Sequence, residues 1–246
     1  MNDVRAHSPD AVAALAAAFS LDDLQAAAVS RYVDFILTWR QGNVTGLTGR
    51  GDVVTTLLGD SLALLDAPLL RAREGREWLD LGAGAGVPGL PLAIALSAAR
   101  VTLLEAAAKK CAFLAAAIAV VGLGERVRVV HARSECFAAA GAPGREAFAV
   151  VLARAVAPLP SLVELAAPLL ACDGVLLASK TRRALTTEGP AAEIAAGECG
   201  LALEPPVRLP RSPLVDAVAV VFRKVAATPD RLPRREGMAV KRPLAR

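Results

Sequence analysis

The residues best suited to bind a ligand form a glycine-rich turn between two apolar runs, at Gly82, Gly84 and Gly86. Glycine adopts backbone conformations that other residues avoid, and it lets a ligand approach the backbone closely. Asp80 comes just before this turn, and Glu105 ends the next apolar run along the chain. An acid at that second position can accept hydrogen bonds from both hydroxyls of a ribose. The turn and the two acids therefore predict a site for a nucleoside-containing cofactor.

The spacing within the turn distinguishes between two classes of cofactor. A dinucleotide fingerprint reads G-x-G-x-x-G, but its third glycine is replaced here by Val87. Asp80 would repel a pyrophosphate, whereas it suits a ligand that carries an ammonium and a sulfonium group. We therefore favour S-adenosylmethionine over the cofactor of an NAD(P)-dependent oxidoreductase. We expect the cofactor to contact Asp80, Gly82, Gly84, Gly86, Val87 and Glu105.

Further polar residues follow the later apolar runs. Ser134 and Glu135 come after the third run, where the edge of an adenine would lie, and Arg154 and Lys180 end the fourth and fifth runs. Two cations beside a cofactor pocket favour an anionic substrate such as RNA. We predict that Arg154 and Lys180 act at the reaction centre, and that Ser134, Glu135 and Arg154 also contact the cofactor.

Alternating strands and helices must position these residues. We predict strands at 77–81, 100–105, 126–131, 147–153 and 174–180, with helices near 90–99, 106–121, 135–140 and 158–171. Continuous apolar runs separated by helices indicate a mainly parallel sheet that is covered on both faces. After a helix at 186–198, strands near 201–209 and 214–224 have a short connection and should pair antiparallel. The predicted fold class is α/β, with seven strands and helices on both faces.

The ends of the chain differ in character from this central part. Residues 1–70 are predicted to form a helical extension, with helices from Pro9 to about Phe19, from an N-cap at Ser20 to about Gln41, and from about Asp52 to Asp66. Ser8 would cap the first of these. The α/β domain that carries the cofactor site would span residues 71–225. Residues 226–246 form a tail rich in arginine and lysine, which suits a phosphate backbone or, alternatively, a solvated segment.

Composition argues against several other classes of protein. The chain has no apolar run of about 18 residues that could cross a membrane, and its first residues lack the pattern of a signal peptide. The four cysteines are widely spaced and there are only two histidines, so we expect reduced thiols and no metal site. We expect a cytoplasmic monomer.

Several segments also resemble a known family, the bacterial 16S rRNA guanine-N7 methyltransferases called RsmG or GidB. They are "WRQGNVTGLT", "GDSLALL", "LDLGAGAGVPGLPLAIAL", "LLEAAAKKCAFL", "RSE", "ARAVAPL", "SK" and "TPDRLPRREGMAVKRPL". The resemblance implies a class I S-adenosylmethionine-dependent methyltransferase fold with an N-terminal helical extension. It also implies methylation of one guanine in 16S rRNA of the small ribosomal subunit or its precursor.

The resemblance extends to individual positions. Gly82, Val87, Glu105, Ser134, Glu135 and Arg154 match cofactor-site positions of the family, and Lys109, Arg133 and Lys180 match basic ones. For RNA contact we predict Lys109 and Arg133, together with Arg234, Arg235 and Lys241 of the tail. Two positions depart from the family, because Leu57 stands where a histidine is frequent and Ala217 where an arginine is common.

The predicted chemistry needs little from the protein beyond positioning. Guanine N7 has a free lone pair and no proton to lose, so its methylation requires no general base. We expect Arg154 to contact guanine O6 or a phosphate, which leaves N7 open. Two alternatives stay open: a small-molecule methyltransferase, against which the basic tail argues, and a non-catalytic cofactor-binding ribosome-assembly factor. Whether the substrate is naked rRNA, a partial particle or a mature subunit also stays open.

Overall fold

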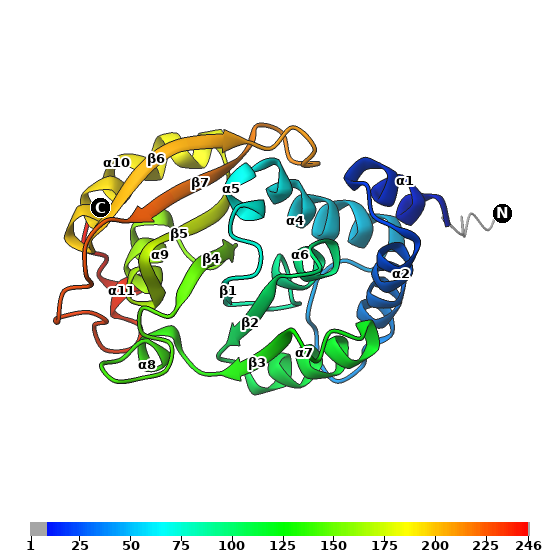
Figure 1. Cartoon of the computed structure of the whole chain (residues 1–246), viewed down its shortest axis with the longest axis horizontal. Helices are drawn as coiled ribbons and strands as arrows, with labels where there is room; N and C mark the ends of the chain where they lie inside the picture. The colour runs from blue at the N-terminus through cyan, green and yellow to red at the C-terminus, as the bar shows by residue number, and fades with distance from the viewer. Residues whose placement is uncertain (1–8, 246) are drawn as a thin grey trace.

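The computed structural model describes residues 9–245, and a seven-stranded sheet runs through its centre (Figure 1). The strand order is β3-β2-β1-β4-β5-β7-β6. The first five strands are parallel, and β7 runs antiparallel to both of its neighbours. Their bounds are β1(Glu77–Leu81), β2(Arg100–Glu105), β3(Val127–His131), β4(Phe148–Arg154), β5(Leu170–Thr181), β6(Leu201–Arg208) and β7(Ala217–Lys224). The predicted fold class, including the antiparallel final pair, is confirmed.

Alternate residues of the strands face two separate cores. Trp78 and Leu103 pack into one core, while Leu79 and Leu104 pack into the other. The first core lies under the N-terminal helices, α6(Gly89–Ala95) and α7(Ala108–Val121), and the second lies under α9(Leu159–Ala166) and α10(Arg182–Glu198). Because helices cover both faces of the sheet, the side chains on both faces are apolar. The strands are therefore continuous apolar runs in the sequence.

Several predicted boundaries move by a few residues. The helix expected at 158–171 is shorter, because α9 ends at Ala166 and one 3-10 turn leads into β5 at Leu170. Helix α10 begins at Arg182, four residues before the predicted start, and the hydroxyl of its N-cap Thr181 accepts a hydrogen bond from the amide of Ala184. Helix α6 ends at Ala95. The short α8(Ser134–Phe137) replaces the helix expected at 135–140.

The N-terminal extension is helical, as expected, but one predicted cap is wrong. It contains α1(Pro9–Phe19), α2(Asp23–Thr38), α3(Arg50–Asp52), a π-helical segment Val53–Gly59, α4(Asp60–Ala63), a 3-10 turn Leu64–Asp66 and α5(Pro68–Arg71). Asp22, not Ser20, caps α2, because the Asp22 carboxylate accepts from the Gln25 amide in a capping box. Ser20 instead has a left-handed backbone with φ 54°. Ser8 lies outside the described residues.

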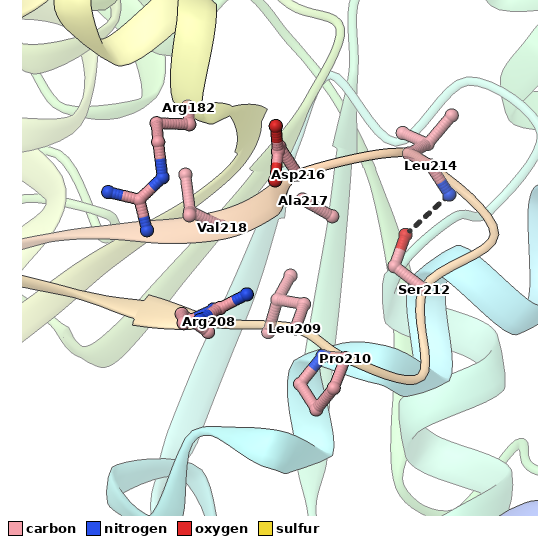
Figure 2. A pocket seen from close by; sticks show the side chains of 9 residues that line it. All are labelled: Arg182, Arg208, Leu209, Pro210, Ser212, Leu214, Asp216, Ala217 and Val218. Carbon is pink, nitrogen blue, oxygen red and sulfur yellow. Dashed lines mark hydrogen bonds between the residues drawn. The ribbon is translucent and has the colours of Figure 1, made fainter.

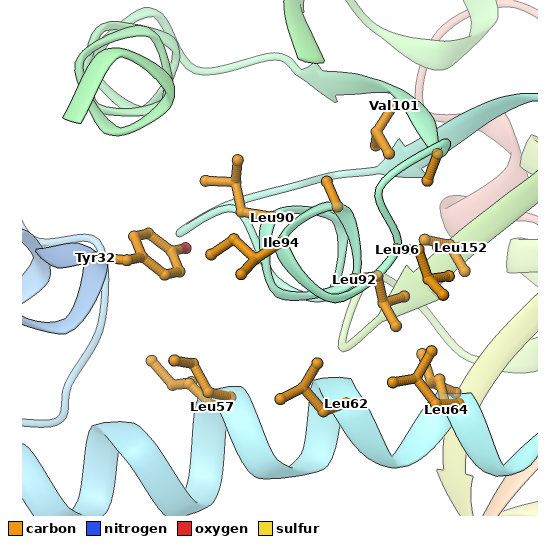
Figure 3. Packing of buried hydrophobic residues seen from close by; sticks show 14 of the residues in the cluster. Tyr32, Leu57, Leu62, Leu64, Leu90, Leu92, Ile94, Leu96, Val101 and Leu152 are labelled. Atoms are coloured by element: carbon orange, nitrogen blue, oxygen red, sulfur yellow. The ribbon is translucent and has the colours of Figure 1, made fainter. Parts of the chain in front are cut away.

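The extension shares a core with the sheet domain. Figure 3 shows Tyr32 of α2, Leu57 of the π-helical segment and Leu62 of α4 packing around Leu90 and Ile94 of α6. Leu57 therefore belongs to an apolar core, at the position where the family resemblance led us to expect histidine. Along residues 9–245, no helix is both long and apolar enough to cross a bilayer.

The C-terminal segment, residues 226–245, folds back onto the protein. It includes α11(Met238–Lys241), which lies beside α9 in Figure 1. Leu232 and Ala239 are buried, at 1% and 3% exposure. The amide of Thr228 donates a hydrogen bond to Glu146. The basic tail is therefore a packed part of the fold, which excludes the alternative of a purely solvated segment.

Candidate functional site

The glycine turn follows β1 at the edge of the sheet where the parallel strands end. Gly82, Gly84 and Gly86 all have positive φ, at +67°, +57° and +85°, a region that favours glycine. A Cβ on Gly86 would come within 2.6 Å of Leu90 Cδ1 and 2.9 Å of the Tyr32 hydroxyl oxygen. Among the described residues, the nearest atom to a Cβ on Gly84 would be the Gly82 carbonyl oxygen, at 3.7 Å. Gly86 therefore allows close packing, and Gly84 leaves space beside the turn.

Glu105 joins the end of β2 to this turn. Its Oε2 accepts a hydrogen bond from the Gly84 amide at 3.0 Å, and its Oε1 accepts one from the Ala107 amide at 2.8 Å. A carboxylate offers about four acceptor sites, so both oxygens keep capacity for a further donor. The predicted contact with a ribose is thus compatible with the way the carboxylate is held.

A pocket of ≈ 220 Å³ opens next to Glu105. Polar groups of Glu105, Ser134 and Glu135 line it together with the backbone of Gly82. Its apolar walls come from Leu81, Leu104, Val156, Leu165 and Val240. Apolar walls with a few placed polar groups are typical of ligand sites, and this combination fits the adenosine part of S-adenosylmethionine. Of the predicted cofactor residues, Asp80, Gly84, Gly86, Val87 and Arg154 lie outside this lining.

Asp80 lies beneath the turn and not at its surface. Its side chain is buried, and its Oδ2 accepts a hydrogen bond from the Gly89 amide at 2.7 Å, where α6 begins. Its Oδ1 is buried and has no hydrogen-bond partner among residues 9–245. Burial raises the pKa of Asp80 to about 7, although the Gly89 hydrogen bond and the charge of Arg154 oppose this rise. Asp80 therefore holds the turn through Oδ2, and its predicted contact with the cofactor stays a prediction.

Tyr32 supports the same turn from the N-terminal extension. Its hydroxyl donates a hydrogen bond to the Ala85 carbonyl oxygen. Burial, with the nearby charge of Asp80, raises the pKa of Tyr32, so the hydroxyl keeps its proton. Sequence reasoning missed this contact, because Tyr32 had the helical spacing of an ordinary core residue.

Arg154 ends β4 and is held by the extension. Its Nε donates to Asp60 Oδ2 at 2.7 Å, and its Nη2 donates to the Thr56 carbonyl oxygen at 2.9 Å. Asp60 is buried and also accepts from the hydroxyls of Ser212, at 2.7 Å, and Ser179, at 3.5 Å. The Nη1 group of Arg154 donates no hydrogen bond to the part of the chain that the structure describes. Asp60 therefore orients Arg154 and leaves one end of its guanidinium free.

Lys180, at the end of β5, is also held by neighbouring elements. Its Nζ donates to the Ala157 carbonyl oxygen at 3.2 Å and to Glu188 Oε2 at 3.0 Å. The same Glu188 oxygen accepts from the Leu159 amide at 2.6 Å. Lys180 thereby joins β5 to α10 and to the start of α9. Its predicted part in the reaction stays a prediction.

The predicted RNA contacts divide into two groups. Lys109, Arg133, Arg235 and Lys241 are exposed, and their contact with RNA stays a prediction. Arg234 is different, because its Nε and Nη2 donate to the two oxygens of Glu164, both at 2.6 Å, and Glu164 is only 2% exposed. A buried carboxylate therefore holds the Arg234 guanidinium, and the contact of Arg234 with RNA also stays a prediction.

The C-terminal segment also closes one side of the pocket, which the sequence did not reveal. The Gly237 amide donates to Glu135 Oε1 at 2.8 Å, while the Ser134 hydroxyl donates to Glu135 Oε2 at 3.1 Å. Gly237 and Val240 both line the pocket. The segment that we expected to contact RNA therefore forms part of the predicted cofactor site.

Comparison with known proteins agrees with these observations. A family model described as rRNA small subunit methyltransferase G matches residues 25–195. A Ribosomal RNA small subunit methyltransferase G from Chloroflexus aggregans is 39% identical, covering 91% of this chain and 92% of that protein. One of the same name from Limosilactobacillus fermentum is 37% identical, covering 92% and 93%.

The similarity of this chain to solved structures concerns the fold alone. A putative transferase from Pyrococcus horikoshii has a TM-score of 0.52 at 17% identity, over 67% of this chain and 63% of that one. A predicted O-methyltransferase from Agrobacterium tumefaciens has a TM-score of 0.50 at 22% identity, over 67% and 81%. The class I methyltransferase fold, the glycine turn and the match over most of the chain lead to one conclusion: the protein belongs to the rRNA small subunit methyltransferase G (GidB) family.

Proposed function

We propose that this protein transfers a methyl group from S-adenosylmethionine to N7 of a guanine in the RNA of the small ribosomal subunit. The cofactor, when bound, would supply a methyl group on a positively charged sulfur: the N7 lone pair forms the new bond to the methyl carbon as the carbon–sulfur bond breaks, the sulfur keeps that electron pair and leaves as a neutral thioether, and the guanine takes the positive charge without loss of a proton. The observation that supports this most directly is the shared edge of the sheet. There, the pocket beside Glu105 lies next to the strand end that carries Arg154.

The residues of the pocket have separate parts in this proposal. Glu105 holds the Gly84 amide and accepts the ribose hydroxyls. Ser134 and Glu135 form the adenine side of the pocket, with Glu135 fixed by the Gly237 amide. Leu104 and Val156 give the base an apolar surface.

Arg154 positions the acceptor. Asp60 and Thr56 hold two of its nitrogens, so that the remaining Nη1 has a defined direction. A guanidinium suits guanine O6 or a phosphate oxygen. In either contact N7 stays accessible, and no proton acceptor is required. Positioning of this kind contributes up to about 7–11 kcal/mol to catalysis in favourable cases.

A methylation assay on unmodified ribosomes tests the proposal. Small subunits and naked 16S rRNA from cells lacking the enzyme are incubated with the protein and tritiated S-adenosylmethionine, and N7-methylguanine is located by chemical cleavage. We expect label at one guanine N7, and a raised cofactor Kd for Glu105→Gln. Glu77→Gln is the matched control, because Glu77 is an exposed acid at the opposite end of β1. Label on another atom or another class of acceptor would overturn the proposal.

A further inference from the structure

A second pocket lies at the same edge of the sheet, beyond β5. It has a volume of ≈ 110 Å³ and lies between the β6–β7 hairpin and the start of α10. Figure 2 shows the Arg182 guanidinium beside Val218 of β7 and Arg208 beside Leu209 on the neighbouring strand, with Asp216 and Ser212 at the turn of the hairpin. The site assignment above uses neither arginine.

The two arginines are available to a ligand. Both are exposed, and within residues 9–245 neither side chain forms a hydrogen bond or an ion pair. Arg211 on the same hairpin contrasts with them, because it pairs with Asp66 and donates to the Ala18 carbonyl oxygen. Among the described residues that line the pocket, Asp216 is the one acid, so this lining keeps an excess of positive charge.

The position of Arg182 adds to this positive field. It is the first residue of α10, a helix of 17 residues. Helix N-termini carry a partial positive charge that favours anions. The Arg182 amide donates to the Asp216 carbonyl oxygen at 2.9 Å, which fixes the start of the helix against the hairpin.

A contact path connects this pocket to the predicted acceptor site. Ser212 lines the pocket, and its hydroxyl donates to Asp60 Oδ1 at 2.7 Å. The other oxygen of Asp60 holds Arg154. β5 and β6 both end at this edge and β7 begins there, so a strand of RNA placed at Arg154 would reach the arginines along the same edge.

We propose that Arg182 and Arg208 bind one backbone phosphate of the RNA, close to the target guanosine. This inference rests on the proposed function and deepens it by naming a substrate contact. The pocket has half the volume of the pocket beside Glu105, so a phosphate group suits it better than a second nucleoside. Guanidinium groups match phosphate geometry and can bind it through two parallel hydrogen bonds.

The salt dependence of RNA binding tests this proposal. The affinity of the Arg182→Ala/Arg208→Ala variant for unmodified 16S rRNA is measured over a range of salt concentrations beside wild type. Loss of one phosphate contact to single-stranded RNA should reduce the slope of log K against log salt by about 0.7. Arg76→Ala/Arg100→Ala is the matched control, because it removes the same charge from exposed residues at the opposite edge of the sheet, near the start of β1 and β2. Its slope should match wild type.

The outcomes separate this inference from the proposed function. If wild type methylates rRNA but the Arg182/Arg208 variant keeps the wild-type slope, the phosphate site is refuted and the proposed function stands. Equal reductions in both double variants would also refute it, since total charge would then explain the effect. If wild type methylates no rRNA, the proposed function itself fails. Cofactor Kd is measured throughout, and Arg182→Gln/Arg208→Gln must reproduce the smaller slope if the alanine pair disturbs folding.

Discussion

Replacing Arg234 by alanine tests whether the C-terminal segment completes the cofactor pocket. The change leaves the Glu164 carboxylate, only 2% exposed, without its charged partner. Removing one partner of a buried pair costs about 3–5 kcal/mol. The Arg234 side chain is 26% exposed, so water reaches the pair in part and we expect the lower end, about 3 kcal/mol. For a chain of this length, that loss corresponds to a Tm lower by about 6–12 °C.

The same variant should weaken cofactor binding. Arg234 anchors the segment in which Gly237 donates to Glu135 and Val240 lines the pocket. We expect the Kd for S-adenosylmethionine to rise about tenfold, or about 1.4 kcal/mol. Thermal unfolding and titration calorimetry measure the two effects, and Arg235→Ala is the control because the neighbouring arginine is exposed. If Arg234→Ala matched Arg235→Ala in both measurements, the structural role of the pair would be refuted.

Three further predictions concern the turn and the acceptor side. Asp80→Asn should gain stability relative to wild type as pH rises from about 4 to about 7. Because the pKa of Asp80 in the folded protein is about 7, folded wild type retains a proton that the unfolded chain loses in this pH window. Denaturant unfolding at several pH values measures the difference in free energy of unfolding between the two proteins, and a difference that did not change with pH would contradict the prediction. Tyr32→Phe should lower the free energy of unfolding by about 1–3 kcal/mol, because it leaves the Ala85 carbonyl oxygen unpaired. Denaturant unfolding measures this change, and an unchanged free energy of unfolding would contradict the hydrogen bond. Arg154→Ala should lower the single-turnover methylation rate more than cofactor affinity, and Glu105→Ala should do the reverse; equal behaviour would reject this division of roles.

Much of the sheet could be predicted because its signals are local. Each central strand is a short apolar run, and Gly82 and Glu105 lie at run ends that the sequence already marks. Parallel strands bring such ends to one edge, so the meeting of Gly82, Glu105, Ser134 and Glu135 in one pocket followed from order alone. Helix limits were less certain, as at α9, where a short 3-10 turn separates helix from strand.

The sequence could not reveal which charges satisfy one another inside the protein. Arg154 and Asp60 are 94 residues apart, and Arg234 and Glu164 are 70 residues apart. An arginine near a chain end has the same pattern whether it faces solvent or a buried carboxylate. Arg234 was therefore assigned to RNA, although its guanidinium lies against Glu164.

The sequence by itself determined the fold class, the glycine turn and the acid at the end of β2, because apolar periodicity and backbone freedom are properties of neighbouring residues. Only the tertiary structure decided that Asp80 supports the turn from below, that Tyr32 and Asp60 bring the N-terminal extension to the site, and that the basic segment closes the pocket. These roles depend on which groups are removed from water together. A buried polar group must find its partner wherever the packed chain supplies one.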